Sequence, residues 1–239
     1  MRKIVTIAAL LACSLVLVSG AYADTISFGI YDSAYGVGSP TSPYVLTGAN
    51  GTLTAGTGTL TFSGSYPSIG DLYIKASGPS APGGTPGTLL TSTLDDTASV
   101  KGTASIFVTD TGITAPLGTL GFTSSFANLG STAKWSITEE TFVDPSDKAF
   151  GGIGGAPLCT QTFTGAGVLV SQTATCSVGG LVLSGPYSET VEYTITSTGS
   201  GTTEDEAGLS PVVPEPASLA LLGSGLLGLV GLGRRRFLK

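Results

Sequence analysis

The sequence contains no histidine, and its 239 residues include only three cysteines and one tryptophan. Histidine is the usual general base of hydrolases, so its absence excludes a Ser-His-Asp or Cys-His catalytic arrangement. A structural zinc site needs four nitrogen or sulfur ligands, which three cysteines without histidine do not supply. We therefore expect no catalytic residue, no metal and no cofactor, and we predict that the protein is not an enzyme.

Carboxylates are the remaining candidates for catalysis or cation binding. A glycosidase needs two carboxylates facing each other across a cleft, and adjacent residues such as Glu139 and Glu140 point to opposite faces of a strand. Calcium binding would use carboxylate oxygens from loops, although solvated acids in turns explain the same residues more simply. The acidic groups are Asp95 with Asp96, Glu139 with Glu140, Asp144 with Asp147, and Glu204 to Glu206.

Positive charge is scarce in the body of the chain. Between Asp24 and Val213 there are fifteen acidic side chains and four lysines, a net charge of −11, whereas the whole chain carries −6. Such a segment repels phosphate backbones, so the charge balance argues against a nucleic-acid partner.

No window of ten residues in the body carries the apolar stripe of an amphipathic helix. Short runs rich in Thr, Val, Ile and aromatic residues alternate in polarity instead, and Gly, Pro, Ser and Asn interrupt them. The clearest run is residues 189–197, in which Val191, Tyr193 and Ile195 share one face, and residues 133–143 have a similar pattern. We therefore expect an all-β fold with a single antiparallel β-sandwich-like domain.

Further strands and two connecting loops follow from the same patterns. The Pro- and Gly-rich stretches at residues 77–87 and 151–157 predict exposed loops. The other expected strands are TISFGIY from Thr25, TLTAGTGTLTF from Thr52, DLYIKAS from Asp71, ASVKGTASIFVTD from Ala98 and TLGFTSSF from Thr119.

Residues 1–23 have the features of a signal peptide. Arg2 and Lys3 precede an apolar run, and Ala21-Tyr22-Ala23 has the small-x-small form that signal peptidase accepts, so the mature chain is expected to begin at Asp24. An alternative is a lipoprotein, because Leu10-Leu11-Ala12-Cys13 loosely resembles a lipoprotein box and would place a lipid on Cys13.

Export leaves two cysteines, Cys159 and Cys176, in the mature chain. An even number of cysteines in an exported chain favours a disulfide. The Thr-rich segments that flank Gly165-Ala166-Gly167 also predict a hairpin between the two cysteines. A bridge that closes a loop of roughly 15 residues stabilises the fold by about 3 kcal/mol in the chain-entropy model.

The C-terminal region divides into a polar stretch and a three-part tail. Residues 198–213 are small, polar and acidic, which predicts a flexible linker. Pro214-Glu215-Pro216 should be extended and exposed, because proline lacks an N–H and restricts its neighbours. The uncharged run of residues 217–233 would span about 25 Å as a helix. Finally, Arg234, Arg235 and Arg236 would hold the end of the chain on the cytoplasmic side.

This tail resembles a PEP-CTERM sorting signal, since VPEPASLALLGSGLLGLVGLGRRR presents the motif, the apolar run and the arginine cluster in the family's order. The resemblance implies recognition by an exosortase, a membrane-embedded transpeptidase-like enzyme, and cleavage near Pro214, Glu215 and Pro216. The bodies of such proteins are diverse, so the tail assigns no chemistry to the rest of the chain. An ordinary C-terminal membrane anchor is the alternative interpretation.

Together, these features predict a surface protein of a Gram-negative-type bacterium that is anchored transiently in the inner membrane. The expected partners are signal peptidase, the exosortase and exopolysaccharide, and the expected role is structural or adhesive, in an exopolysaccharide or biofilm matrix. The expected segments are a signal peptide (1–23), an all-β extracellular domain (24–197), a linker (198–213) and a sorting signal with a transmembrane helix (214–239).

A carbohydrate-binding module is the alternative function from another class. Such a module would present coplanar exposed aromatic side chains to a sugar. The candidates are Tyr31, Tyr35, Tyr44, Tyr66 and Tyr73.

Overall fold

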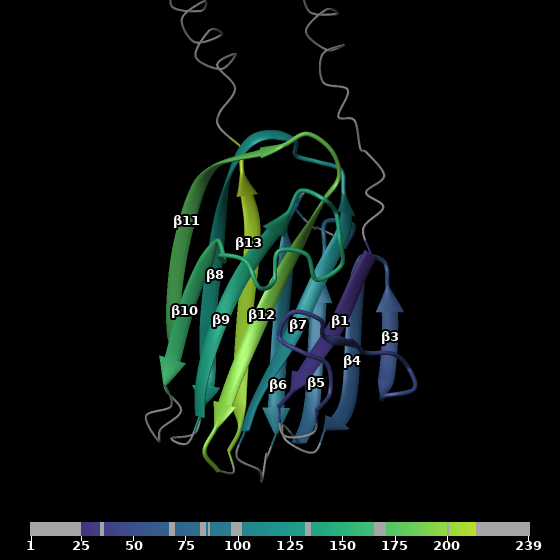
Figure 1. Ribbon diagram of the computed structural model, residues 1–239, viewed down its shortest axis with the longest axis vertical. Coiled ribbons are helices and arrows are strands. Elements are labelled where there is room, and N and C mark those ends of the chain that lie inside the picture. Colours follow the sequence, from purple (N-terminus) through teal and green to yellow (C-terminus); the bar gives the residue numbers. More distant parts are fainter. Residues whose placement is uncertain are drawn as a thin grey trace, which may run out of the picture.

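Figure 1 shows the computed structural model of the protein, which is built from β-strands in two layers. The structure describes residues 25–33, 36–66, 70–81, 85, 87–96, 102–131, 135–164, 171–199 and 201–213. Within these ranges, no helix long and apolar enough to span a membrane is found. The predicted signal peptide with Ala21, Ala23 and Asp24, and the tail that contains Pro214 and Arg234, lie outside the described residues.

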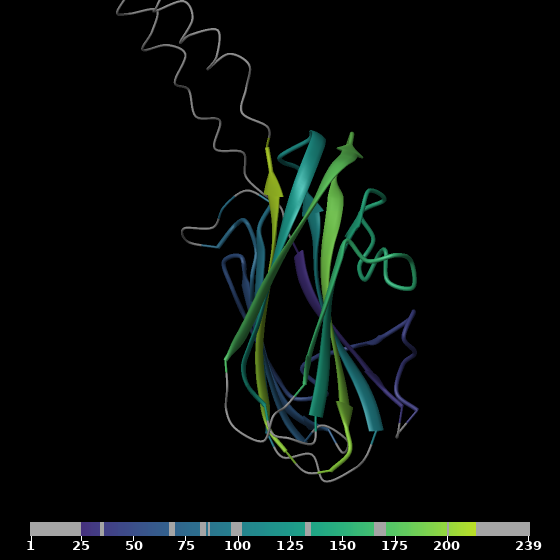
Figure 2. The same ribbon diagram turned by 90° about the vertical axis from the view of Figure 1, so that its left-hand side faces the viewer.

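Two antiparallel sheets pack face to face, which confirms the predicted all-β sandwich (Figures 1 and 2). The six-stranded sheet has the order β10 (Cys159–Thr164), β9 (Trp135–Asp144), β12 (Tyr187–Ser197), β7 (Gly102–Ile113), β1 (Thr25–Asp32) and β2 (Tyr44–Val45). The seven-stranded sheet has the order β11 (Gln172–Leu183), β8 (Gly118–Ser131), β13 (Thr203–Val212), β6 (Leu89–Asp96), β5 (Gly70–Ser77), β4 (Thr59–Tyr66) and β3 (Thr52–Gly56).

Alternation along each strand places apolar side chains between the sheets. On β12, Val191, Tyr193 and Ile195 are all buried in the main core, as their spacing predicts. Facing strands of the other sheet contribute residues such as Phe62 and Ile74 to the same core. A second, smaller apolar cluster includes residues of β7, β8, β12 and β13, so the interior is filled from both sheets.

Two loops, one between β1 and β2 and one after β9, cover the outer face of the six-stranded sheet. The Phe150 ring from the loop after β9 meets Phe107 of β7 edge-on at 6.3 Å. The Phe150 backbone N–H donates to Thr109 Oγ1 at 3.4 Å. On β1, an added Cβ at Gly29 would come within 3.0 Å of Phe150 and of Pro43, so this glycine admits both loops. Figure 2 shows the loops on one side of the sandwich.

The segment predicted as a strand from Thr52 is a hairpin of β3 and β4. The two strands pair from Thr52 with Ser63 to Gly56 with Thr59. Gly58 has a φ of +60°, a conformation that glycine adopts without strain, and it allows the chain to reverse. The alternation of polar and apolar residues continues through this turn, so the sequence pattern alone does not show where the chain reverses.

The predicted linker at residues 198–213 is wrong, because β13 is an interior strand of the seven-stranded sheet. It pairs with β8 on one side and with β6 on the other. Asp205 and Ala207 are buried, whereas Glu204 and Glu206 are exposed, so the acidic composition conceals a strand alternation. The folded domain therefore extends beyond the predicted boundary at residue 197 and includes Val212.

The predicted disulfide is confirmed, but the predicted hairpin around it is wrong. Cys159 and Cys176 are bonded, with their Cα atoms 6.0 Å apart. However, β10 pairs with β9 in one sheet and β11 pairs with β8 in the other. The bond therefore joins edge strands of the two sheets. Thr-rich alternation fits a strand in either sheet, so the local pattern does not specify the partner.

Candidate functional site

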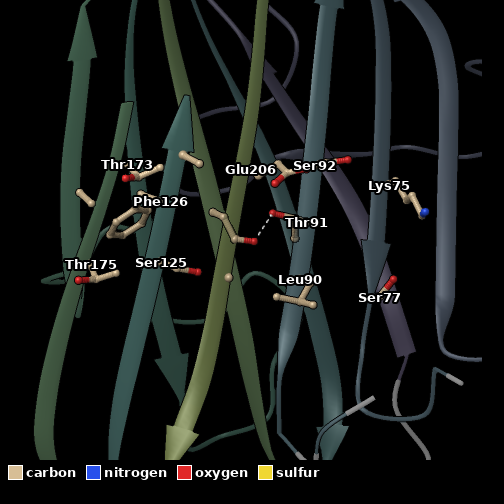
Figure 3. Close-up of a pocket in the computed structure, with 14 residues that line it drawn as sticks. Lys75, Ser77, Leu90, Thr91, Ser92, Ser125, Phe126, Thr173, Thr175 and Glu206 are labelled. Carbon is tan, nitrogen blue, oxygen red and sulfur yellow. Dashed lines mark hydrogen bonds between the residues drawn. The ribbon is translucent and has the colours of Figure 1, made fainter. Parts of the chain in front are cut away.

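A shallow groove of about 390 Å³ lies on the outer face of the seven-stranded sheet (Figure 3). Its walls and floor come from β5, β6, β13, β8 and β11, which run side by side in that order. Neighbouring strands in a sheet lie about 4.8 Å apart, so five strands give the groove a length of about 19 Å. It is therefore long enough to accept a short stretch of a linear polymer lying across the strands.

The strand register resolves the groove into two rows of side chains. The first row is formed by successive cross-strand partners, namely Lys75, Ser92, Glu206, Ala127 and Thr173. The second row is formed in the same way by Ser77, Leu90, Gly208, Ser125 and Thr175. Each row takes one residue from each of five strands, so the groove exists only when β13 occupies its central place.

Gly208 keeps the groove open at its middle. A Cβ added there would lie 2.8 Å from Ser125 Oγ and 2.9 Å from Leu90 Cδ2. Beneath the groove, Thr91 donates a hydrogen bond to the Ala207 carbonyl at 3.1 Å and is also hydrogen-bonded to the Tyr193 hydroxyl of the other sheet. The floor is therefore tied to the core by buried polar contacts.

Hydroxyl groups dominate the polar lining of the groove. Serine and threonine side chains line it on four strands, and they donate and accept hydrogen bonds without net charge. Lys75 and Glu206 add one charge of each sign, and both are exposed. Leu90, which is 54% exposed, supplies an apolar surface between them. Such a lining suits a neutral or weakly charged polyhydroxylated ligand better than a strongly anionic one.

The tyrosines proposed for sugar stacking do not assemble into one platform among the described residues. Tyr44, 47% exposed, belongs to β2, whereas Tyr73, 41% exposed, belongs to β5 of the other sheet. Tyr66 instead packs near Phe62, with ring centroids 6.4 Å apart. Tyr31 is only partly exposed, and Tyr35 lies outside the described residues. From the sequence, only aromatic residues were considered for sugar binding, and a groove whose polar lining is mainly serine and threonine was missed.

A buried pair of carboxyl groups lies between the two sheets, beneath and apart from the groove. Glu139 on β9 and Asp205 on β13 are both fully buried. Asp205 accepts hydrogen bonds from Asn128 Nδ2 at 2.7 Å and from Thr203 Oγ1 at 2.7 Å. Among the described residues, no other group satisfies the carboxyl oxygens of Glu139, which interacts with Asp205 and also lies near the Tyr193 hydroxyl.

The environment of this pair places a proton on Glu139. Burial, followed by the nearby charge of Asp205 and a hydrogen bond to it, raises the Glu139 pKa to about 10. Burial raises the Asp205 pKa to about 6, while hydrogen bonds from Asn128 and Thr203 oppose the increase. Glu139 is therefore a neutral acid at pH 7 and Asp205 is the charged member of the pair.

A second buried acidic pair separates the two apolar clusters. Glu189 on β12 and Asp110 on β7 are directly opposite each other in the register, and both are fully buried. Burial, with the Asp110 charge as the next cause, raises the Glu189 pKa well above its ordinary value. Neither acidic pair opens onto the groove, so the two-carboxylate cleft of a glycosidase is not formed by these residues.

Two of the acids considered for calcium binding, Asp144 and Asp147, have structural roles in the turn after β9, whereas the side chains of Asp95 and Asp96 lie outside the described part of the structure. Asp144 accepts hydrogen bonds from the Ser146 N–H at 2.8 Å and from the Ser146 hydroxyl at 2.6 Å. Asp147 accepts one from the Gly112 N–H at 2.7 Å. Among the described residues, no group of three acidic or cysteine side chains is placed to hold a metal ion. The turn therefore accounts for these two acids.

The fold and its C-terminal extension define an antiparallel β-sandwich followed directly by a sorting segment. Residues 212–236 match the model of the PEP-CTERM protein-sorting motif, so the chain carries this motif as predicted from Pro214, Glu215, Pro216 and the arginine cluster. The motif supports an exosortase-sorted surface protein. A search of curated proteins finds no match to the chain.

Solved structures show a distant likeness to this chain. A carbohydrate-binding module of the β-sandwich superfamily is 11% identical, with a TM-score of 0.33 and coverage of 72% of this chain and 66% of the module. The TmCBM61 module in complex with β-1,4-galactotriose is 12% identical, with a TM-score of 0.30 and coverage of 57% and 81%. The K1 adhesin domain of Lys-gingipain from Porphyromonas gingivalis W83 is 10% identical, with a TM-score of 0.30 and coverage of 78% and 97%. Scores this low carry no information about a ligand.

Proposed function

We propose that this protein is exported under its signal peptide, cut by an exosortase near Pro214 to Pro216, and left at the cell surface as a non-catalytic adhesive domain. The transmembrane run and Arg234 to Arg236 anchor the precursor in the inner membrane until cleavage. The released β-sandwich then contacts exopolysaccharide in the surrounding matrix. Signal peptidase, the exosortase and the polysaccharide are its partners.

The position of β13 carries this proposal. The strand ends at Val212, and the sorting motif begins at the same residue. Cleavage at the Pro-Glu-Pro segment would therefore remove no strand and leave every interior contact of β13 in place. Because the last strand and the sorting motif meet at Val212, the cleavage site follows a complete fold without an intervening linker.

The intact mass of the surface-exposed protein tests the sorting step. The full chain is expressed in a host that has an exosortase, and the surface fraction is compared for the wild type and for Glu215→Ala. The wild type should begin at Asp24 and end near Pro214 to Pro216, whereas Glu215→Ala should retain the tail. Glu204→Ala, an exposed change on β13, is the matched control and should be processed normally.

Two other outcomes of the mass measurement would contradict or modify the sorting proposal. A wild-type mass that retains all residues through Lys239 would overturn the sorting proposal, and the protein would then be a membrane-anchored β-domain. A mass increase of glycan or lipid size on Cys13 or elsewhere would identify a modified or lipoprotein form instead.

The groove supports exopolysaccharide as the adhesive partner, since its lining is rich in hydroxyls and its length suits a polymer. Gly208→Ala tests this because its methyl group would fill the middle of the groove. We expect weaker retention in affinity electrophoresis through exopolysaccharide purified from the host, with dextran as the reference polymer. Gly185→Ala is the matched control, because an added Cβ there meets no atom within 4 Å. Equal retention of both variants and wild type would exclude the groove.

A carbohydrate-binding module is the second candidate, and the same groove favours it. A module of this class would bind one defined oligosaccharide at a stoichiometry of one per chain, and Gly208→Ala would abolish that binding. A matrix adhesin would instead bind the polymer and show no measurable affinity for short fragments. Calorimetric titration with graded oligosaccharides distinguishes the two.

A further inference from the structure

The longest edge strand that the structure describes is β11, which carries no charged residue. Among the described residues, β11 pairs with β8 on one side and no strand pairs with its other side. Its sequence, QTATCSVGGLVL, contains no charged residue and no proline. Natural proteins usually block edge strands with charges, prolines, bulges or short length, because unpaired backbone groups recruit other strands.

The first seven residues of β11 lack each of these protections. From Gln172 to Val178 the pairing with β8 is regular, and the register shifts only between Val178 and Leu181. The other described edge strands are shorter, since β2 has two residues, β3 five and β10 six. The strand β11 lies at one side of the seven-stranded sheet (Figure 1). An extended edge segment presents alternate backbone N–H and C=O groups there.

The charge distribution favours another copy of the same chain as the partner of this edge. Neither β11 nor its neighbour β8 contains a charged residue, although the body of the chain is strongly acidic. Two acidic domains repel each other over most of their surfaces, and this repulsion is weakest where both present an uncharged side. The nearest side chains on the outer face are hydroxyls, including a Thr123 to Ser177 hydrogen bond of 3.0 Å.

The disulfide holds this edge in place for pairing. Cys176 lies next to Thr175, the central residue of the seven-residue segment, and is bonded to Cys159 on the edge of the other sheet. The bond links β11 covalently to β10, so β11 loses less conformational entropy when a second strand docks.

We propose that β11 is a self-association surface, through which two copies of this chain join antiparallel into one continuous sheet. Full overlap of residues 172–178 about a two-fold axis places Thr175 opposite the same residue of the second copy. It also places Thr173 opposite Ser177 of the second copy, and these exposed hydroxyl side chains form favourable cross-strand pairs. This contact goes beyond the adhesive role, because it makes the displayed domains a connected layer.

Cysteine crosslinking of the full chain in its host membrane tests the contact. Thr175→Cys should give a disulfide-linked dimer on non-reducing gels, because the two introduced thiols face each other. Thr173→Cys and Ser177→Cys, each alone, should give none, since each faces a hydroxyl, whereas the double variant should give the dimer. The strand is present before and after removal of the tail, so the result does not depend on exosortase processing.

Charge variants in the Thr175→Cys background test the register independently of folding. Adding Thr173→Lys with Ser177→Lys places like charges opposite each other twice and should remove the dimer. Adding Thr173→Lys with Ser177→Glu places opposite charges together and should retain it. Both pairs change the same two exposed positions, so they are matched for effects on the monomer. Absence of the Thr175→Cys dimer, or equal dimer with Thr173→Cys or with both charge pairs, would overturn the proposal.

Discussion

The buried acid Glu139 should make this protein less stable as the pH rises from acidic to alkaline. Its pKa lies near 10 in the folded state, because burial and the Asp205 charge oppose ionisation. In the unfolded chain it is near 4.3. Between these values the folded state holds one more proton than the unfolded state, so the free energy of unfolding falls with pH. The stabilising contribution is complete below the unfolded pKa and is lost as the pH rises toward the folded pKa.

The size of this pH dependence follows from the one extra proton that the folded state holds. Each pH unit between the two pKa values changes the free energy of unfolding by about 1.4 kcal/mol. From pH 5 to pH 8, Glu139 alone therefore lowers stability by about 4 kcal/mol. Glu139→Gln removes this titration and keeps an N–H donor for Asp205. The variant should gain stability relative to the wild type as the pH rises, by about 4 kcal/mol across this range.

Urea denaturation at several pH values measures this difference. The fluorescence of Trp135 reports unfolding, since it is the single tryptophan, is buried and donates to the Gly199 carbonyl at 3.1 Å. Glu140→Gln is the matched control, because Glu140 points to the opposite face and is hydrogen-bonded to Thr160. Parallel curves for Glu139→Gln and wild type would refute the assignment of a proton to Glu139, as would an equal change in Glu140→Gln.

Two further predictions concern the disulfide and the last strand. Replacing Cys159 and Cys176 together by Ala should lower the free energy of unfolding by about 3 kcal/mol, because the bond closes a loop of 17 residues; adding reductant to the wild type should have a similar effect, and unchanged urea midpoints would contradict it. A chain that ends at residue 213 should unfold cooperatively by Trp135 fluorescence, whereas one that ends at residue 202 should not. Equal unfolding of the two chains would show that β13 is dispensable.

Several features of the fold were predictable because they depend on neighbours in the sequence. The alternation around Tyr193 marks a strand and its buried face, and the structure confirms both. Cys159 and Cys176 are the two cysteines left outside the expected signal peptide, so their pairing followed from arithmetic. The same arithmetic did not reveal that the bond joins two sheets, because strand partners are set by contacts between distant segments.

The candidate groove was not predictable in the same way. Its rows join residues as far apart in the sequence as Lys75 and Glu206, and its members are ordinary residues of an exposed strand face, half of them serine or threonine. The acidic run that contains Glu206 resembled a linker in composition. Only its insertion between β6 and β8 turns it into the middle of a site.

The sequence by itself determined the all-β class, the paired cysteines and the sorting tail, because these follow from local alternation, from a count of cysteines and from a continuous motif. The tertiary structure alone decided that β13 completes the sheet, that Glu139 meets Asp205 across the core, and that β11 lies at an open edge. Alternation specifies which face of a strand is buried, but it does not specify which strand lies beside it. That choice depends on packing the whole chain at once.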